Sequence, residues 1–244
     1  MWFIKAVIFD FIGTLANVKN YSLEDSKLKL YRAVANTGFN LDVKNFWEAY
    51  NQAHEKYRAI RYEKLIEVTN AIWIAEALTN LGFETDPEDT RIKTAVNVFF
   101  KDYLRSLELR LCAKTMLKKF SIYYKLGLVS NFTYAPVIYA GLRKLGINQF
   151  FNAVLVSEEV GLRKPHIKIF EETLRRLGVK AEEAVYVGDS PLEDMQGAKD
   201  AGMKTIFVPS QFYSIEDLCE SKQQPSLIAN DICELYKKIS KAFL

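Results

Sequence analysis

Histidine and cysteine are scarce in this chain. Its 244 residues include two histidines, His54 and His166, and three cysteines, Cys112, Cys219 and Cys233. The cysteines are widely separated and form no CxxC pair, so nitrogen and sulfur ligands are too few for a zinc site. An odd number of distant cysteines predicts buried, reduced thiols, which are typical of an intracellular protein.

A basic block and a long apolar run are also missing. Lysine and arginine are scattered among acidic residues and the net charge is only +3, so we predict no nucleic-acid partner. The apolar run near the N-terminus contains Lys5 and stops at Asp10, which makes it too short and too charged for a signal or membrane-spanning segment. We therefore expect a soluble, cytoplasmic protein with no membrane partner.

The apolar run itself predicts a buried β-strand over residues 3–9. Asp10 follows this strand directly, and Gly13 and Thr14 come next. Open α/β sheets bind ligands at the carboxyl ends of their strands. Asp10 is therefore the first candidate for a functional side chain.

Residues 16–111 show helical periodicity and few signs of strands. Four helices in a row predict a small helical bundle inserted after the first strand. We expect this insertion to act as a lid over the strand ends, because closing lids exclude water from a reaction. The predicted helices cover residues 22–36, 43–58, 62–81 and 87–109.

Strands and helices alternate from residue 112 to the end, which predicts a parallel sheet with right-handed crossovers. The fold class is therefore α/β: residues 1–15 and 112–244 form the core domain, and residues 16–111 form an all-α cap. The predicted strands cover residues 126–130, 153–156, 184–187 and 205–208, and the predicted helices 113–123, 134–145, 167–177, 191–201 and 228–243.

Polar side chains stand at successive strand ends of this predicted sheet. Each has a simple explanation alone: a serine can cap a helix, a loop lysine is usually solvated, and an acid favours the first turn of a helix. Their convergence at one sheet edge is the argument for a site. They are Asp10, Thr14, Ser130, Asn131, Lys164, Asp189 and Asp194.

The chemistry that these residues suggest is displacement by a carboxylate nucleophile, Asp10. Ser130, Asn131 and Lys164 would hold a small anionic substrate and stabilise charge in the transition state. Several clustered acids cannot all stay ionised without a counter-ion, and Mg²⁺ is the hard cation that oxygen ligands prefer. We therefore predict Mg²⁺ as the cofactor.

These stretches resemble the motifs of the haloacid dehalogenase-like (HAD) hydrolase superfamily. The matching segments are residues 9–15, 129–131, 164–165 and 187–194, followed by 197–198 and 201–202, in the order that the family has. The resemblance implies a Rossmann-like core with a helical cap inserted after the first motif. It also implies a hydrolase in which Asp10 is the nucleophile, Thr14 orients the first-motif loop, Ser130 binds phosphate and Lys164 is the motif-three lysine. Asp189 and Asp194 match the metal-associated acids, and the backbone carbonyl of Ile12 joins the metal shell.

Ile12 departs from the family pattern, because the family's phosphatases carry a second aspartate there as general acid and base. Isoleucine transfers no proton, and losing a positioned acid costs about 10²–10⁴-fold in rate. Three interpretations follow. The first is a Mg²⁺-dependent phosphatase of a small phosphorylated metabolite, favoured by the acid cluster. The second is a 2-haloacid dehalogenase-like enzyme, in which halide leaves without a proton. The third is a weakly active or inactive binding protein.

Overall fold

The computed structural model describes residues 4–243 and divides into two compact units. The unit boundaries fall after Val18 and after Ser106. One unit therefore contains both flanking parts of the chain, and the other is a continuous insertion. No helix within residues 4–243 is long and apolar enough to cross a membrane.

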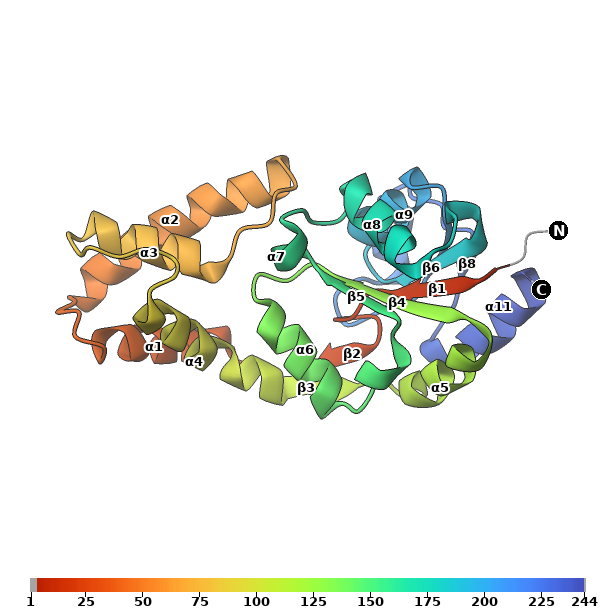
Figure 1. Ribbon diagram of the computed structural model, residues 1–244, viewed down its shortest axis with the longest axis horizontal. Coiled ribbons are helices and arrows are strands. Elements are labelled where there is room, and N and C mark those ends of the chain that lie inside the picture. The colour runs from red at the N-terminus through yellow and green to blue at the C-terminus, as the bar shows by residue number, and fades with distance from the viewer. Residues whose placement is uncertain (1–3, 244) are drawn as a thin grey trace. The chain divides into compact units, whose positions relative to one another are not determined.

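The larger unit is built on a six-stranded parallel sheet (Figure 1). Its strand order, β5-β4-β1-β6-β7-β8, runs outward from β1 in both directions, so the chain reverses its direction of travel across the sheet beside β1. Such a switch point is where α/β sheets bind ligands. The predicted α/β fold class is confirmed. The strands are β1 (Ala6–Phe9), β4 (Lys125–Ser130), β5 (Ala153–Val156), β6 (Ala184–Gly188), β7 (Lys204–Phe207) and β8 (Leu227–Ile228).

Helices cover both faces of the sheet, which explains why β1 is apolar on both sides. Figure 1 shows α8 (Ile167–Leu177) and α9 (Gly197–Asp200) on one face, and α5 (Ala113–Tyr123) and α11 (Leu235–Phe243) on the other. Ile8 packs in the same buried cluster as Phe170 of α8, whereas the ring of Phe9 lies 6.3 Å from that of Phe120 of α5. Alternate residues of β1 therefore anchor the two layers. The larger unit also contains α6 (Ala135–Lys144), α7 (Ser157–Val160) and α10 (Ile215–Glu220).

The inserted unit is entirely helical, as predicted. Two of its helix starts use side-chain caps: Ser22 accepts the N–H of Asp25, and Asp42 accepts that of Asn45. Aromatic rings fill its interior, with the rings of Tyr31 and Phe46 5.5 Å apart. The helices are α1 (Leu23–Ala35), α2 (Val43–Glu63), α3 (Asn70–Asn80) and α4 (Thr90–Ser106).

Several predicted bounds differ from the structure. The helix predicted over 62–81 begins only at Asn70, because residues 64–69 form a connection in which Leu65 has a left-handed φ of 55°. The segment over 191–201 is a π-helix (Pro191–Gln196) that continues into α9. The predicted helix over 228–243 starts later, as a 3₁₀ turn (Ile232–Glu234) followed by α11.

Several short elements were not predicted, because each is too short to show a period. β2 (Ala16–Val18) and β3 (Leu107–Leu109) pair as an antiparallel ribbon that belongs with the sheet, so the helical unit itself covers 19–106 where the sequence analysis sets 16–111. The others include α7, α10 and β8, and β8 contributes two residues to the edge of the sheet. Of the predicted first strand, residue 3 lies outside the described part of the chain.

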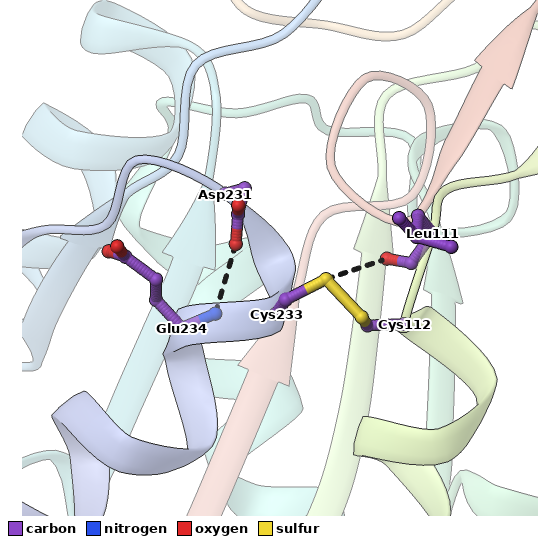
Figure 2. Close-up of a disulfide and its surroundings, with 5 residues drawn as sticks. All are labelled: Leu111, Cys112, Asp231, Cys233 and Glu234. Carbon is purple, nitrogen blue, oxygen red and sulfur yellow. Dashed lines mark hydrogen bonds between the residues drawn. A yellow bond between two sulfur atoms is a disulfide. The ribbon is translucent and has the colours of Figure 1, made fainter.

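The expectation of reduced, buried thiols is wrong. Cys112 and Cys233 form a disulfide, with their Cα atoms 5.2 Å apart (Figure 2), and Cys219 is free but exposed. The bond joins residues 121 positions apart in the sequence. The spacing of the cysteines along the chain therefore could not predict this disulfide, because the pairing depends on the fold bringing α11 beside α5.

Candidate functional site

Asp10 leaves the end of β1 between β4 and β6, and its side chain is buried, with 6% exposed. A tight turn follows, in which the N–H groups of Leu15 and Ala16 both donate to the carbonyl of Phe11, at 2.9 and 3.0 Å. This turn reverses the chain into β2. It keeps residues 11–14 close to the strand ends, where the other predicted site residues lie.

Gly13 and Thr14 link this turn to Asp189. The Thr14 hydroxyl donates to Oδ1 of Asp189 at 3.2 Å. Gly13 has a φ of 101°, and a Cβ added to it would lie 2.2 Å from Oδ2 of Asp189. Glycine is therefore required at position 13 both for its backbone conformation and for the space that the carboxylate occupies.

Lys164 is the centre of a buried network. Its ammonium donates to Oδ1 of Asp10 at 2.8 Å and to Oδ1 of Asp194 at 2.6 Å. It also donates to the hydroxyl of Tyr186 at 3.0 Å and to the carbonyl of Val129 at 3.2 Å. The side chain is almost fully buried, so these contacts replace its hydration.

Asn131 fixes the backbone that carries this lysine. Its amide oxygen accepts the N–H of Lys164 at 2.8 Å, and its amide nitrogen donates to the carbonyl of the same residue at 3.0 Å. The amide is thus used to position Lys164. Ser130, the other predicted anion-binding residue of this segment, is buried at the carboxyl end of β4.

Asp189 and Asp194 lie beyond the end of β6. Oδ2 of Asp194 accepts the backbone N–H groups of Asp189 and Ser190 at 3.1 and 3.0 Å. The Ser210 hydroxyl donates to Oδ2 of Asp189 at 2.5 Å. A Cβ added at Gly188 would lie 2.3 Å from Oδ2 of Asp194, so this glycine lets the carboxylate fold back onto the strand end.

The structure brings three acids together, since one oxygen each of Asp10, Asp189 and Asp194 lies within 4.8 Å of the others. Burial raises the pKa of Asp10 to about 8 against the opposing effect of Lys164. Burial also raises the pKa of Asp189 to about 6, with the charge of Asp194 adding to the shift. Both shifts indicate that the charged form of each carboxyl is disfavoured, because the nearby positive charge does not compensate for burial.

Lys164 is the group that offsets part of this charge. Burial alone would lower its pKa, but the carboxylates of Asp10 and Asp194 outweigh burial and raise it above the ordinary lysine value. The lysine is therefore a fixed cation in this site. Oδ2 of Asp10, by contrast, is buried and has no hydrogen-bond partner among residues 4–243. Three buried acids gathered around a single lysine fit a hard divalent cation.

Ile12, the variant position, lies inside the turn after Asp10 and is half-buried. It forms an isolated backbone bridge with Ala16, and the next N–H, that of Gly13, donates to the Ala16 carbonyl at 2.8 Å. The backbone of the turn is therefore set by main-chain bonds. An isoleucine at position 12 neither makes nor breaks them.

Sequence reasoning missed four contributors to the site. Tyr186 is a strand residue that reads as core, and Ser210 and Arg110 lie in segments without a motif. The fourth is Arg163, whose buried guanidinium pairs with the partly exposed Glu193 at an N···O distance of 2.8 Å. Only Arg163 had a local signal, its position beside Lys164, because the others reach the site through tertiary contacts.

Comparisons with known proteins agree with this fold. A glyceraldehyde 3-phosphate phosphatase from Methanopyrus kandleri is 34% identical over 206 residues, which cover 83% of this chain and 83% of that protein. Among solved structures, a 2-haloacid dehalogenase from Pseudomonas syringae pv. Tomato DC3000 shares the fold with a TM-score of 0.71 at 22% identity, over 98% of this chain and 99% of that one. The putative HAD-hydrolase YfnB from Bacillus subtilis, solved bound to magnesium, has a TM-score of 0.58 at 20% identity, over 98% and 99% of the two chains. The family model described as haloacid dehalogenase-like hydrolase matches residues 7–208, and the chain belongs to that family of enzymes.

Proposed function

We propose that this enzyme is a Mg²⁺-dependent phosphatase of a small phosphorylated metabolite. The observation that carries the proposal is that the two oxygens of the Asp10 carboxylate have different surroundings. Oδ1 of Asp10 accepts from Lys164 at 2.8 Å, whereas Oδ2 is buried and has no partner among residues 4–243. One oxygen is therefore held, and the other is left to react.

In the first step, Oδ2 of Asp10 forms a bond to phosphorus while the bond from phosphorus to the leaving oxygen breaks. Lys164 offsets the negative charge of the phosphoryl oxygens, which must approach the Asp10 carboxylate that it contacts. Ile12 has no proton to donate, so the leaving oxygen takes its proton from water. A substrate with a good leaving group, or a slow turnover, is the expected consequence.

In the second step, water adds to the phosphorus of the aspartyl phosphate. The bond from phosphorus to Oδ2 breaks, which restores the Asp10 carboxylate and releases inorganic phosphate. Splitting the hydrolysis in this way replaces one difficult displacement by two easier ones. Ser130 and Asn131 complete the proposed anion-binding segment after β4.

Asp10 and Asp189 would hold Mg²⁺, together with the backbone carbonyl of Ile12. Asp194 would add negative charge, since its oxygens already accept from Lys164 and from two backbone N–H groups. When bound, the cation would neutralise the acids and the phosphoryl oxygens and so allow two anions to approach each other.

The test is release of inorganic phosphate from a panel of phosphate esters and acyl phosphates, with Mg²⁺ and with EDTA. Glyceraldehyde 3-phosphate comes first, because the Methanopyrus kandleri relative is named for it. We expect activity that needs Mg²⁺ and is lost in Asp10→Asn, which keeps the shape of the side chain but not its nucleophilic charge. No phosphate release from any compound would refute the proposal.

Ile12 favours a second candidate, a 2-haloacid dehalogenase, because halide leaves a carbon centre without a proton. Asp10 would then form an ester with the substrate carbon. Release of chloride from 2-chloropropionate in the presence of EDTA would establish this activity. The cluster of three acids supports the phosphatase instead, since it fits a cation that this alternative does not require.

A further inference from the structure

Arg110 joins the segment after β3 to the loop that follows Asp10. Its backbone N–H donates to the carbonyl of Leu15 at 3.0 Å. Its guanidinium donates through Nη1 to the carbonyl of Gly13 at 2.7 Å, with the carbonyl of Thr14 3.4 Å away. One side chain thus holds the turn between Asp10 and β2 from outside the site.

The same guanidinium reaches a second loop, because Nη2 donates to the carbonyl of Pro209 at 2.9 Å, just after β7. The residues on these two loops that touch Asp189 are immediate neighbours of the carbonyls that Arg110 holds. Thr14 donates to Oδ1 of Asp189, and Ser210 donates to Oδ2. Arg110 therefore fixes the spacing between the two hydroxyls that orient one carboxylate.

The disulfide lies two residues further along the chain (Figure 2). The N–H of Ala113 donates to the Arg110 carbonyl at 3.1 Å, which closes a turn that contains Cys112 with a left-handed φ of 67°. Cys233, on the other side of the bond, belongs to the 3₁₀ turn before α11. The bond therefore connects the base of the Arg110 side chain to a second element of the core.

The partner segment of the disulfide is itself ordered by a cap. Asp231 accepts the N–H of Glu234 at 3.0 Å (Figure 2), and its charge also acts on Arg110. Burial lowers the pKa of Arg110, and the carboxylates of Asp189 and Asp231 partly oppose that shift. Arg110 thus interacts electrostatically with an acid of the site and with an acid of the segment that carries Cys233.

We propose that Arg110 is a positioning residue for the Asp189 carboxylate and that the Cys112–Cys233 disulfide holds Arg110 in place, so that opening the disulfide loosens both loops around Asp189. The consequence for turnover rests on the proposed phosphatase function. The placement of the loops does not, and it can be measured without any substrate. Cys233 is exposed, so a reductant in solution can reach the bond.

The experiment measures amide hydrogen exchange at residues 13–16 and 210–213 in five forms of the full chain. They are the oxidised wild type, the wild type reduced with a phosphine, Arg110→Met, Cys112→Ser with Cys233→Ser, and the combination of all three substitutions. We expect exchange in both segments to rise about tenfold or more in Arg110→Met, because charge-assisted bonds to three carbonyls are lost. Reduction, which converts the disulfide to two thiols, should raise exchange in the same segments.

The triple variant tests whether the disulfide affects exchange in the two loops through Arg110. If the disulfide acts through Arg110, the triple variant exchanges no faster in these segments than Arg110→Met alone. If the effects multiply fully, the disulfide does not act through Arg110 and that half of the proposal is overturned. Unchanged exchange in Arg110→Met overturns the other half. Reduction of the folded wild type gives the disulfide result even where the serine variant fails to fold.

Two matched controls distinguish the loss of the Arg110 contacts or of the disulfide from a general rise in exchange across the protein. Cys219→Ser removes the exposed free thiol of α10. Lys125→Met removes a different bond from a cation to a carbonyl, that of Nζ to Leu177 at 2.7 Å. Neither should change exchange at residues 13–16 or 210–213. As a second readout, the rise in melting temperature on adding Mg²⁺ should shrink in Arg110→Met and in the reduced wild type, and persist in both controls. A full Mg²⁺ shift in Arg110→Met would show that Asp189 keeps its place without Arg110.

Discussion

The Lys164 ammonium lies 2.8 Å from Oδ1 of Asp10, whereas Oδ2 of the same carboxylate has no hydrogen-bond partner among residues 4–243. The same ammonium lies 2.6 Å from Oδ1 of Asp194. One buried cation therefore orients the proposed nucleophile and holds an acid of the proposed metal site. Because Asn131 fixes the backbone of Lys164, the position of the ammonium is set by the fold before any substrate binds.

Replacing Lys164 by methionine should lower kcat for phosphate release by about 10²–10³-fold, the usual loss on removing one preorganised group that stabilises charge. Arginine should not restore the rate, since its planar fork does not fit the almost fully buried space of the ammonium. Steady-state kinetics with the best substrate of the panel measures the change. Lys168→Met, on the exposed side of α8, is the matched control and should keep wild-type kinetics. Near-normal kcat in Lys164→Met would contradict the role given to this lysine.

Gly188 determines where the Asp194 carboxylate can lie. A Cβ at this position would be 2.3 Å from Oδ2 and 2.4 Å from Cγ of Asp194, and both atoms belong to a carboxylate fixed by two backbone N–H groups. We expect Gly188→Ala to displace Asp194 and to reduce the Mg²⁺-induced rise in melting temperature to less than half. Differential scanning calorimetry with and without Mg²⁺ measures this.

The control for Gly188→Ala is Gly161→Ala, at the end of α7. Gly161 has a φ of 74°, so alanine strains the backbone there, but its Cβ would meet nothing within 4 Å. Gly161→Ala should lower the melting temperature by a few degrees and keep the full Mg²⁺ shift. If both variants lose the same fraction of the shift, crowding at Asp194 is not the cause.

The sequence alone predicted those elements whose apolar residues recur with a regular period. The strand over 153–156 and the helix over 167–177 have the predicted bounds, because their apolar periods and the following Gly178 are local signals. The convergence of Asp10, Lys164, Asp189 and Asp194 was also foreseeable, since strands of a parallel sheet end at one edge. The side chains that follow each strand could therefore be predicted from the few residues at the end of that strand.

Features that depend on tertiary contact were not foreseeable. Tyr186 reads as an ordinary strand residue, yet its hydroxyl bonds Lys164 and Asp194 because β6 lies beside β1. The Cys112–Cys233 bond joins residues 121 positions apart, and no spacing rule connects them. Nothing local distinguishes Arg110 from a surface arginine until the two loops that it holds have been placed by the sheet.

The Ile12→Asp substitution tests whether the other residues that a phosphatase needs are in place. An aspartate at this position can protonate the leaving oxygen and later activate water, and a positioned acid–base group contributes about 10²–10⁴-fold. We expect kcat for phosphate release to rise by several hundredfold, most for substrates with poor leaving groups. Ile12→Asn, of the same shape but without a proton to transfer, is the matched control and should stay at the wild-type rate. No gain in Ile12→Asp would favour a protein that binds its ligand without turning it over.

The inserted helical unit contains a largely buried ion pair between Arg61, near the end of α2, and Glu67, in the connection to α3. The two side chains are 13% and 0% exposed, with an N···O distance of 2.5 Å. Arg61→Met would leave the Glu67 carboxylate buried without this cation, which should lower the free energy of unfolding by about 3–5 kcal/mol.

Two comparisons with Arg61→Met make this prediction specific, and urea unfolding followed by tryptophan fluorescence measures both, since Trp73 is buried in α3. Arg58→Met breaks an exposed pair with Glu55 on the same helix and should cost less than about 1 kcal/mol. Arg61→Met combined with Glu67→Met should recover most of the lost stability, because the penalty comes from burying the Glu67 carboxylate without the Arg61 cation and not from the missing contact. If the double variant is as unstable as Arg61→Met, or if Arg61→Met is no worse than Arg58→Met, the ion pair does not hold the connection between α2 and α3.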